Sequence, residues 1–99
     1  MNKLDASERD LVGAWIVSSE GFRADETCAR IEWLVREVLQ QVAVSPQWGA
    51  WQTLFRDPAD GRLWERTYPE GERQGGGPPR LTNISLDDAV ARYGVEVVR

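Results

Sequence analysis

The chain has 99 residues, of which 41% are hydrophobic and 28% are charged, and this balance is typical of one small soluble globular domain spanning residues 1–99. Twelve basic against sixteen acidic residues give a formal net charge of -4, which argues against nucleic acid as a partner and favours a basic protein. The absence of histidine and the single cysteine exclude histidine-based catalysis, disulfides within the chain and zinc sites built from His or Cys clusters.

The sequence shows no targeting or membrane segment. Its first ten residues are polar and mixed in charge, and no apolar run approaches the ~20 residues that a membrane-spanning helix needs. We therefore expect a cytoplasmic protein without membrane contact, in keeping with the free thiol of Cys28. We also expect a monomer or a weak homo-oligomer.

Two elements are predicted in the first half of the chain. Residues 11–19 are rich in Val, Ile and Trp, which predicts a strand buried on both faces that ends at Glu20-Gly21. Residues 26–43 place apolar side chains three and four positions apart, which predicts a helix of ~27 Å with Asp25 as its N-cap. Cys28 falls on the apolar face of this helix, where a small buried hydrophobe is expected.

A β-hairpin is predicted next. Residues 48–55 and 63–68 have the aromatic and β-branched composition of strands. The segment 57–62 between them contains the Pro and Gly that a hairpin loop uses to fix its backbone angles.

The chain is predicted to end with a strand at 80–84 and a helix that Ser85 opens and Gly94 closes, followed by an edge strand or a frayed end at 95–98. The order strand, helix, three strands, helix predicts an α+β fold, a small sheet of about four mainly antiparallel strands with two helices packed on one side. The orientation of the first strand stays open, because its connection passes through a helix.

The glycine-rich segment is the first candidate site. It lacks the lysine and hydroxyl of a phosphate-binding loop, and a strand rather than a helix follows it. Two interpretations stay open. Its glycines permit unusual φ angles while its prolines fix a rigid exit, or the loop presents backbone groups to a partner. The residues concerned are Gly75, Gly76, Gly77, Pro78 and Pro79.

Three carboxylates around the predicted hairpin loop form a second candidate site, namely Asp57, Asp60 and Glu65. Their spacing misses that of a calcium-binding loop, and turn chemistry is the simpler interpretation of the two aspartates. A carboxylate cluster of this kind is also what a small metal-dependent hydrolase uses. Interleaved arginines favour ion pairs instead; they are Arg56, Arg62 and Arg66.

Aromatic residues beside arginine form a third candidate site. Alternation along a strand places Trp64, Arg66 and Tyr68 on one side, a composition typical of interface centres and also of the edge of a core. Trp33 lies on the more polar side of the predicted helix, so it is either an exposed binding anchor or covered by another element.

Five segments resemble, in order and spacing over about residues 11–93, the immunity protein 27 family of bacterial polymorphic toxin systems: LVGAW at 11–15, DETCARI at 25–31, DPADGRLWE at 57–65, TYP at 67–69 and GGGPP at 75–79. The family's acidic position falls on Asp25 or Asp57. Gln74 stands where the family often has a histidine, which implies a different partner contact at that position.

The resemblance implies a non-enzymatic antidote without cofactor or metal, which binds a cognate secreted toxin domain and occludes its active site. A basic nuclease is the kind of toxin that the acidic charge would suit. The expected contact residues are Trp33, Asp57, Asp60, Arg62, Trp64, Glu65, Arg66, Tyr68, Gly75, Gly76, Gly77, Pro78 and Pro79. The alternatives are the carboxylate-based hydrolase and a small-ligand-binding module built on the glycine-rich loop.

Overall fold

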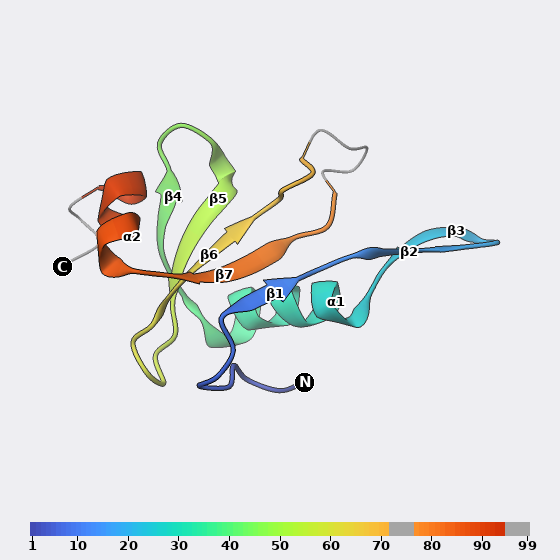
Figure 1. Cartoon of the computed structure of the whole chain (residues 1–99), viewed down its shortest axis with the longest axis horizontal. Coiled ribbons are helices and arrows are strands. Elements are labelled where there is room, and N and C mark those ends of the chain that lie inside the picture. The colour runs from blue at the N-terminus through green and yellow to red at the C-terminus, as the bar shows by residue number, and fades with distance from the viewer. Residues whose placement is uncertain (72–76, 95–99) are drawn as a thin grey trace.

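The computed structural model describes residues 1–71 and 77–94 (Figure 1). Its elements are β1 (Asp10–Val12), β2 (Trp15–Ser18), β3 (Gly21–Ala24), α1 (Glu26–Trp33), the π-helical turn η1 (Leu34–Val38), β4 (Gln40–Ser45), β5 (Gly49–Arg56), β6 (Leu63–Thr67), β7 (Arg80–Ile84) and α2 (Leu86–Tyr93). The predictions for Gly75, Gly76 and residues 95–98 lie outside the described residues.

The main sheet has five strands in the order β1-β7-β6-β5-β4, and every neighbouring pair is antiparallel. β2 and β3 form a separate two-stranded hairpin that projects from the body of the molecule, at the end away from α2 (Figure 1). The predicted α+β class and the β5–β6 hairpin are confirmed, with five strands in the sheet where about four were expected. The first strand is antiparallel to its neighbour β7.

The two helices pack on opposite faces of the sheet. Successive residues of a strand point to opposite faces, so Phe55 and Trp64 join a core under α1 while Leu54 and Leu63 join a second core under α2. The expectation of two helices on one side is therefore wrong, because β5 and β6 carry apolar side chains on both faces. The other buried members are Leu11, Ile31, Leu34, Leu39 and Leu81 in the first core, and Ala89 and Tyr93 in the second.

The first helix is shorter than its apolar pattern predicts. Its N-cap is confirmed, since the Asp25 carboxylate accepts a hydrogen bond from the Cys28 N–H at 2.8 Å. The π-helical turn that follows α1 ends at Val38, and Leu39 has an extended backbone with φ −84° and ψ 151°. Residues 40–43 lie in β4 instead, where the β-branched Val42 suits a strand and pairing with β5 satisfies the backbone.

The second helix follows its prediction. Ser85 Oγ accepts a hydrogen bond from the Asp88 N–H at 3.1 Å, and α2 ends at Gly94, whose φ of 97° is costly for other residues. Within the described residues, no helix has the length and apolar character needed to cross a membrane.

The strand predicted at residues 11–19 is divided at Gly13. β1 pairs with β7, and the Gly13 N–H donates to the Pro79 carbonyl at 2.9 Å. The chain then leaves the sheet, and the Ala14 carbonyl accepts a hydrogen bond from the Asp25 N–H at 3.0 Å, which closes the root of the β2–β3 hairpin. β2 is mostly exposed rather than buried on both faces, because the hairpin projects from the body.

No side chain fits at Gly13. A Cβ there would lie 2.6 Å from Cys28 Sγ and 2.7 Å from the Pro79 carbonyl oxygen. Cys28 is buried, as predicted; its thiol donates to the Ala14 carbonyl at 3.4 Å, and burial raises the pKa of that thiol. One close-packed point thus joins β1, α1 and the segment that enters β7, which we call the Gly13 junction (Gly13, Cys28 and Pro79).

We expect Gly13→Ala to lower the free energy of unfolding by about 1–3 kcal/mol, because the added methyl group overpacks the Gly13 junction. Urea unfolding measures the difference, with Ala14→Ser at the neighbouring exposed position as the control. An unfolding midpoint of Gly13→Ala equal to that of the wild-type chain would contradict the close packing described here.

Candidate functional site

The loop between β5 and β6 is held by its own side chains. Asp57 is buried, and its carboxylate accepts a hydrogen bond from the Ala59 N–H at 2.9 Å. Asp60 accepts two from Arg62, from the backbone N–H at 3.0 Å and from Nε at 2.6 Å. These are the bonds of a capped turn, so the turn interpretation of the two aspartates holds.

Arg62 connects this loop to the N-terminal segment. Its Nη1 donates to the Glu8 carbonyl at 2.7 Å and its Nη2 to the Asp5 carbonyl at 2.9 Å. The guanidinium also lies 4.9 Å from the ring centroid of Trp64, within cation–π distance. The fork of Arg62 is therefore occupied within the chain, which does not favour its predicted role as a partner contact.

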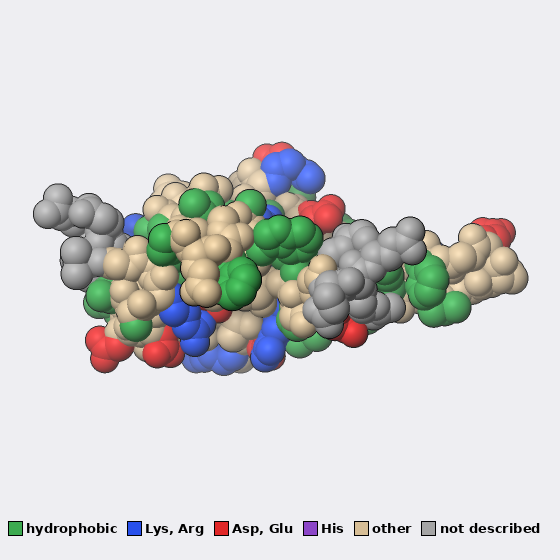
Figure 2. Space-filling model, turned by 90° about the horizontal axis from the view of Figure 1, so that it is seen from above, with side chains coloured by type: hydrophobic (Ala, Val, Ile, Leu, Met, Phe, Trp, Pro, Cys, Tyr) green, Lys and Arg blue, Asp and Glu red, His purple; other side chains and the backbone are tan. Residues whose placement is uncertain are grey.

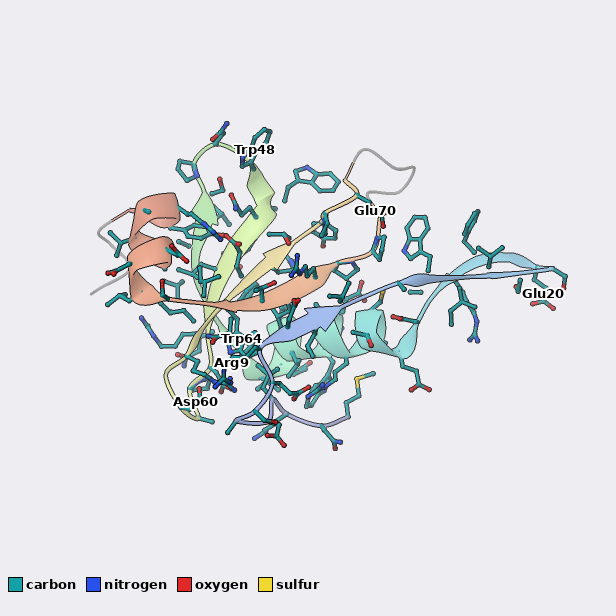
Figure 3. All side chains as sticks on the ribbon, viewed as in Figure 1. Arg9, Glu20, Trp48, Asp60, Trp64 and Glu70 are labelled. Carbon is teal, nitrogen blue, oxygen red and sulfur yellow. The ribbon has the colours of Figure 1, made fainter. Side chains whose placement is uncertain are left out.

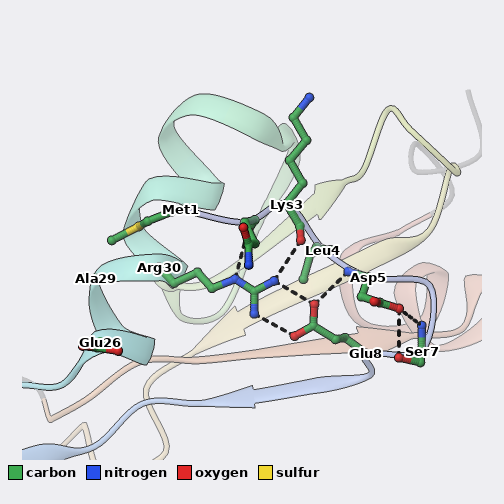
Figure 4. Close-up of a pocket in the computed structure, with 10 residues that line it drawn as sticks. Met1, Lys3, Leu4, Asp5, Ser7, Glu8, Glu26, Ala29 and Arg30 are labelled. Carbon is green, nitrogen blue, oxygen red and sulfur yellow. Dashed lines mark hydrogen bonds and ion pairs between the residues drawn. The ribbon is translucent and has the colours of Figure 1, made fainter.

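A hollow of about 860 Å³ lies between the N-terminal segment and α1 (Figure 4). It is lined by a bidentate ion pair, in which Arg30 Nη1 and Nη2 each lie 2.7 Å from a carboxylate oxygen of Glu8. Arg30 also donates to the carbonyls of Asn2 and Lys3, both at 3.0 Å. The charged groups of the hollow already satisfy one another, so we do not interpret it as a ligand site. Instead, the Arg30–Glu8 ion pair acts as a clamp that holds the N-terminal segment on α1.

Glu65 is the buried carboxylate of the second core. Its Oε1 accepts a hydrogen bond from Arg92 at 2.7 Å, and its Oε2 accepts one from the Tyr93 hydroxyl at 2.8 Å and one from Gln52 at 3.0 Å. Burial and this carboxylate raise the pKa of Tyr93. Glu65 thereby fixes α2 to β5 and β6, and it lies on the opposite sheet face from Arg66.

The structure corrects the prediction for Trp64 and answers the question left open for Trp33. Trp64 is 0% exposed and lies at the centre of the first core, so it is not the exposed anchor that was expected (Figure 3). Both faces of β6 are apolar at that point, and the face carrying Trp64 is covered by α1. Trp33 is half-buried and packs against the same core. Strand alternation itself is confirmed, since Arg66 and Tyr68 share the Trp64 face.

The described end of the glycine-rich segment is structural. Gly77, Pro78 and Pro79 are all buried, which corrects their prediction as a contact surface. Gly77 has a φ of 72°, and a Cβ there would lie 2.5 Å from the Glu70 carbonyl oxygen. Pro79 belongs to the Gly13 junction. The conformational interpretation of this segment therefore holds for its last three residues.

A group of exposed and half-buried side chains lies at the opposite end of β5 and β6 from the Asp60 loop (Figure 3). We call it the aromatic–arginine patch and define it as Trp48, Trp51, Arg66 and Tyr68. Trp48 is 59% exposed and Trp51 is 54% exposed. The rings of Trp51 and Tyr68 meet edge to face, with centroids 5.3 Å apart. Shallow hollows of about 360 and 300 Å³ open on the patch, and both are lined by Trp51 and Tyr68.

Arg66 supplies the charge of the patch. Its guanidinium carbon lies 5.5 Å from the ring centroid of Phe55 and 5.7 Å from that of Tyr68. Its one hydrogen bond within the described residues is a long contact of 3.5 Å to Thr53 Oγ1, and its buried Nε has no partner there. No described carboxylate forms an ion pair with it. Arg66 is thus an arginine held between aromatic rings with unused hydrogen-bonding capacity.

Trp48 and Trp51 are not among the contact residues expected from the sequence. Ser45 Oγ holds the turn that presents Trp48, accepting hydrogen bonds from the N–H groups of Gln47 at 3.2 Å and Trp48 at 3.0 Å. Gly49 completes the turn with a φ of 61°. Trp51 lies on the same face as Phe55 but beyond the cover of α1. The sequence pattern that could have identified Trp51 is the alternation of β5, which places it on the same face as Phe55. That pattern does not show whether a residue on this face is buried or exposed.

The predicted carboxylate cluster does not form. Asp57 and Asp60 sit in the turn between β5 and β6, whereas Glu65 is bound to α2, and residues 1–71 and 77–94 contain no group of three potential metal-ligating side chains. What the described surface offers instead is a contact site. Tryptophan, tyrosine and arginine are the residue types that dominate binding energy in protein interfaces.

Comparison with known proteins agrees with the resemblance of the sequence. The family model described as Immunity protein 27 matches residues 18–85, a region that contains β3 through β7 and the whole aromatic–arginine patch. No curated protein and no solved structure matches the chain at a significant level.

The Arg30–Glu8 ion pair that holds the N-terminal segment leads to a prediction for how the free energy of unfolding depends on pH. Its hydrogen bonds with Arg30 lower the pKa of Glu8 from 4.5 to about 2. A carboxylate whose pKa is lowered by folding stabilises the native state above its ordinary pKa, and this contribution is lost as the pH falls toward the folded value. We expect Glu8→Gln to cost about 1–2 kcal/mol at pH 7 and progressively less between pH 4.5 and pH 2.

Urea unfolding of the wild-type chain and Glu8→Gln across this pH range measures the effect. Glu37→Gln is the control, because Glu37 is exposed and its only described ion pair is with the exposed Arg36. A cost of Glu8→Gln that stays constant with pH would contradict the lowered pKa of Glu8.

Proposed function

The chain belongs to the immunity protein 27 family, and from that premise we propose that it binds a cognate toxin domain of a bacterial polymorphic toxin system and neutralises it in the cytoplasm by occluding its active site. In this role the chain is a binding protein and not an enzyme. The aromatic–arginine patch is the contact surface that we propose for the toxin.

The observation that carries this assignment is that Arg66 combines contact with aromatic rings and unused hydrogen-bond donors. Arg66 lies half-buried against the rings of Phe55 and Tyr68 and forms no ion pair with a described carboxylate, so its guanidinium keeps donors that a partner can accept from. Its planar fork suits a carboxylate or a main-chain carbonyl of a partner, and the rings beside it supply apolar contact area. Exposure of Trp48 and Trp51 next to this charge gives the composition of a binding hot spot.

The net charge supports one class of toxin. An acidic protein of formal charge -4 attracts a basic partner over distances beyond direct contact and so raises its association rate. A nuclease domain, whose substrate is polyanionic, needs such a basic surface. We therefore propose a basic nuclease as the toxin, with Arg66 meeting an acidic or carbonyl group inside an otherwise basic surface.

The test of the proposed function is co-expression with the toxic domain encoded beside this chain's gene. We expect the chain to restore growth and to co-purify with that domain as a stable complex. Failure both to restore growth and to bind would contradict the proposed function, whatever surface is involved.

Within a confirmed complex, Trp51→Ala and Trp48→Ala test the patch. Each is expected to weaken toxin binding by about 2 kcal/mol or more, roughly 30-fold in Kd, because each removes an exposed aromatic anchor. Titration calorimetry with a catalytically inactive toxin domain measures the affinity. The control is Leu86→Ala, which truncates an exposed apolar side chain on α2. If both tryptophan variants bind as tightly as Leu86→Ala, the contact surface lies elsewhere.

A further inference from the structure

The β2–β3 hairpin carries a second exposed apolar surface. Its register pairs Trp15 with Ala24 and Val17 with Phe22, and residues paired directly across two strands share one face. We call these four residues the hairpin face. Val17 is 71% exposed and Phe22 is 64% exposed, and the Phe22 ring contacts that of Trp15 at a centroid distance of 5.9 Å. The hairpin face consists entirely of apolar side chains, which is unusual for a projecting ribbon.

The hairpin differs from the other edges of the protein. The main sheet ends in β1, which has three residues, and in β4, whose pairing with β5 is interrupted by two register shifts. Short and irregular edge strands are common protection against unwanted strand pairing. β2 and β3 pair without a register shift and carry neither Lys nor Pro. A regular apolar ribbon of two strands is marginally stable in water, so a partner that buries its apolar face stabilises it.

The hairpin face by itself is too small for a stable interface with any partner. A stable interface buries about 800 Å² on each partner and uses 20–30 residues a side, and the hairpin face offers four. Its occupant must therefore also contact another part of the chain. Figure 2 looks down on the end of the molecule where Trp48 lies in Figure 3, and it shows hydrophobic side chains both over the middle of that face and on the projecting hairpin.

We propose that the hairpin face is a second contact element for the toxin domain, which docks an apolar surface on Val17 and Phe22 while it also engages the aromatic–arginine patch. This inference rests on the proposed function. A domain bound in this way spans both groups of exposed apolar side chains and also contacts residues around them, because a stable complex needs more than these eight side chains. The hairpin contributes affinity through apolar burial, whereas Arg66 contributes a directed polar contact.

The test compares the two faces of the hairpin in binding to a catalytically inactive toxin domain. Threonine keeps the preference for a strand while removing apolar surface. We expect the double variant Val17→Thr/Phe22→Thr to raise the Kd at least 10-fold. The matched control is Ile16→Thr, which lies next to Val17 on the opposite face and is expected to change the Kd less than about 2-fold.

A second measurement needs no substitution. Hydrogen exchange of the wild-type chain is expected to slow at residues 15–24 when the toxin domain binds. If the wild-type chain binds the toxin but its hairpin amides are not protected and the double variant binds equally tightly, the hairpin inference is overturned and the proposed function stands. A wild-type chain that does not bind overturns both. Sedimentation of the free chain as a dimer that the double variant abolishes would assign the hairpin face to a second copy instead.

Discussion

The close approach of Gly13 to Pro79 and Cys28 is the constraint on which the rest of the structure depends. It brings together the segment before the first hairpin, the first turn of α1 and the entry to β7, which are far apart in the sequence. Only glycine fits where a Cβ would lie within 2.7 Å of two neighbours. Three motifs that carry much of the family resemblance therefore each place one residue at this packing point: Gly13 from LVGAW, Cys28 from DETCARI and Pro79 from GGGPP. The role that the structure gives these three residues is to pack the fold.

The contact surface that we propose from the structure therefore differs from the one expected from the sequence. Residues expected to contact a partner because they are charged, aromatic or glycine-rich are engaged within the chain: Arg62 holds the N-terminal segment, Glu65 holds α2, and Trp64 fills the first core. Arg66 is the exception, since it shares a strand with these residues but has no ion-pair partner among those described. The aromatic–arginine patch forms around it because α1 covers Phe55 and Trp64 and stops short of Trp51.

One face of the sheet therefore has two parts. The part under α1 forms the first core and stabilises the fold, and the part around Trp51 is uncovered and available for contact. Two ion pairs add to this apolar packing, because Arg30 with Glu8 holds the N-terminal segment and Arg92 with Glu65 holds α2 on the second core. Apolar side chains remain exposed on the patch and on the hairpin face. Exposed apolar surface of this kind is what proteins bury when they associate.

The sequence by itself determined the features set by local chemistry. Asp25 and Ser85 cap their helices, Pro and Gly turn the chain between β5 and β6, and the alternation of β6 places Arg66 and Tyr68 on one face. Tertiary structure decided the end of the first helix, the split at Gly13, the placement of the helices on opposite faces, and which tryptophans are buried. Trp51 and Trp64 occupy strands of similar composition, and they differ because α1 covers one and not the other. Local pattern specifies an amphipathic element, but burial depends on which distant segment packs against it.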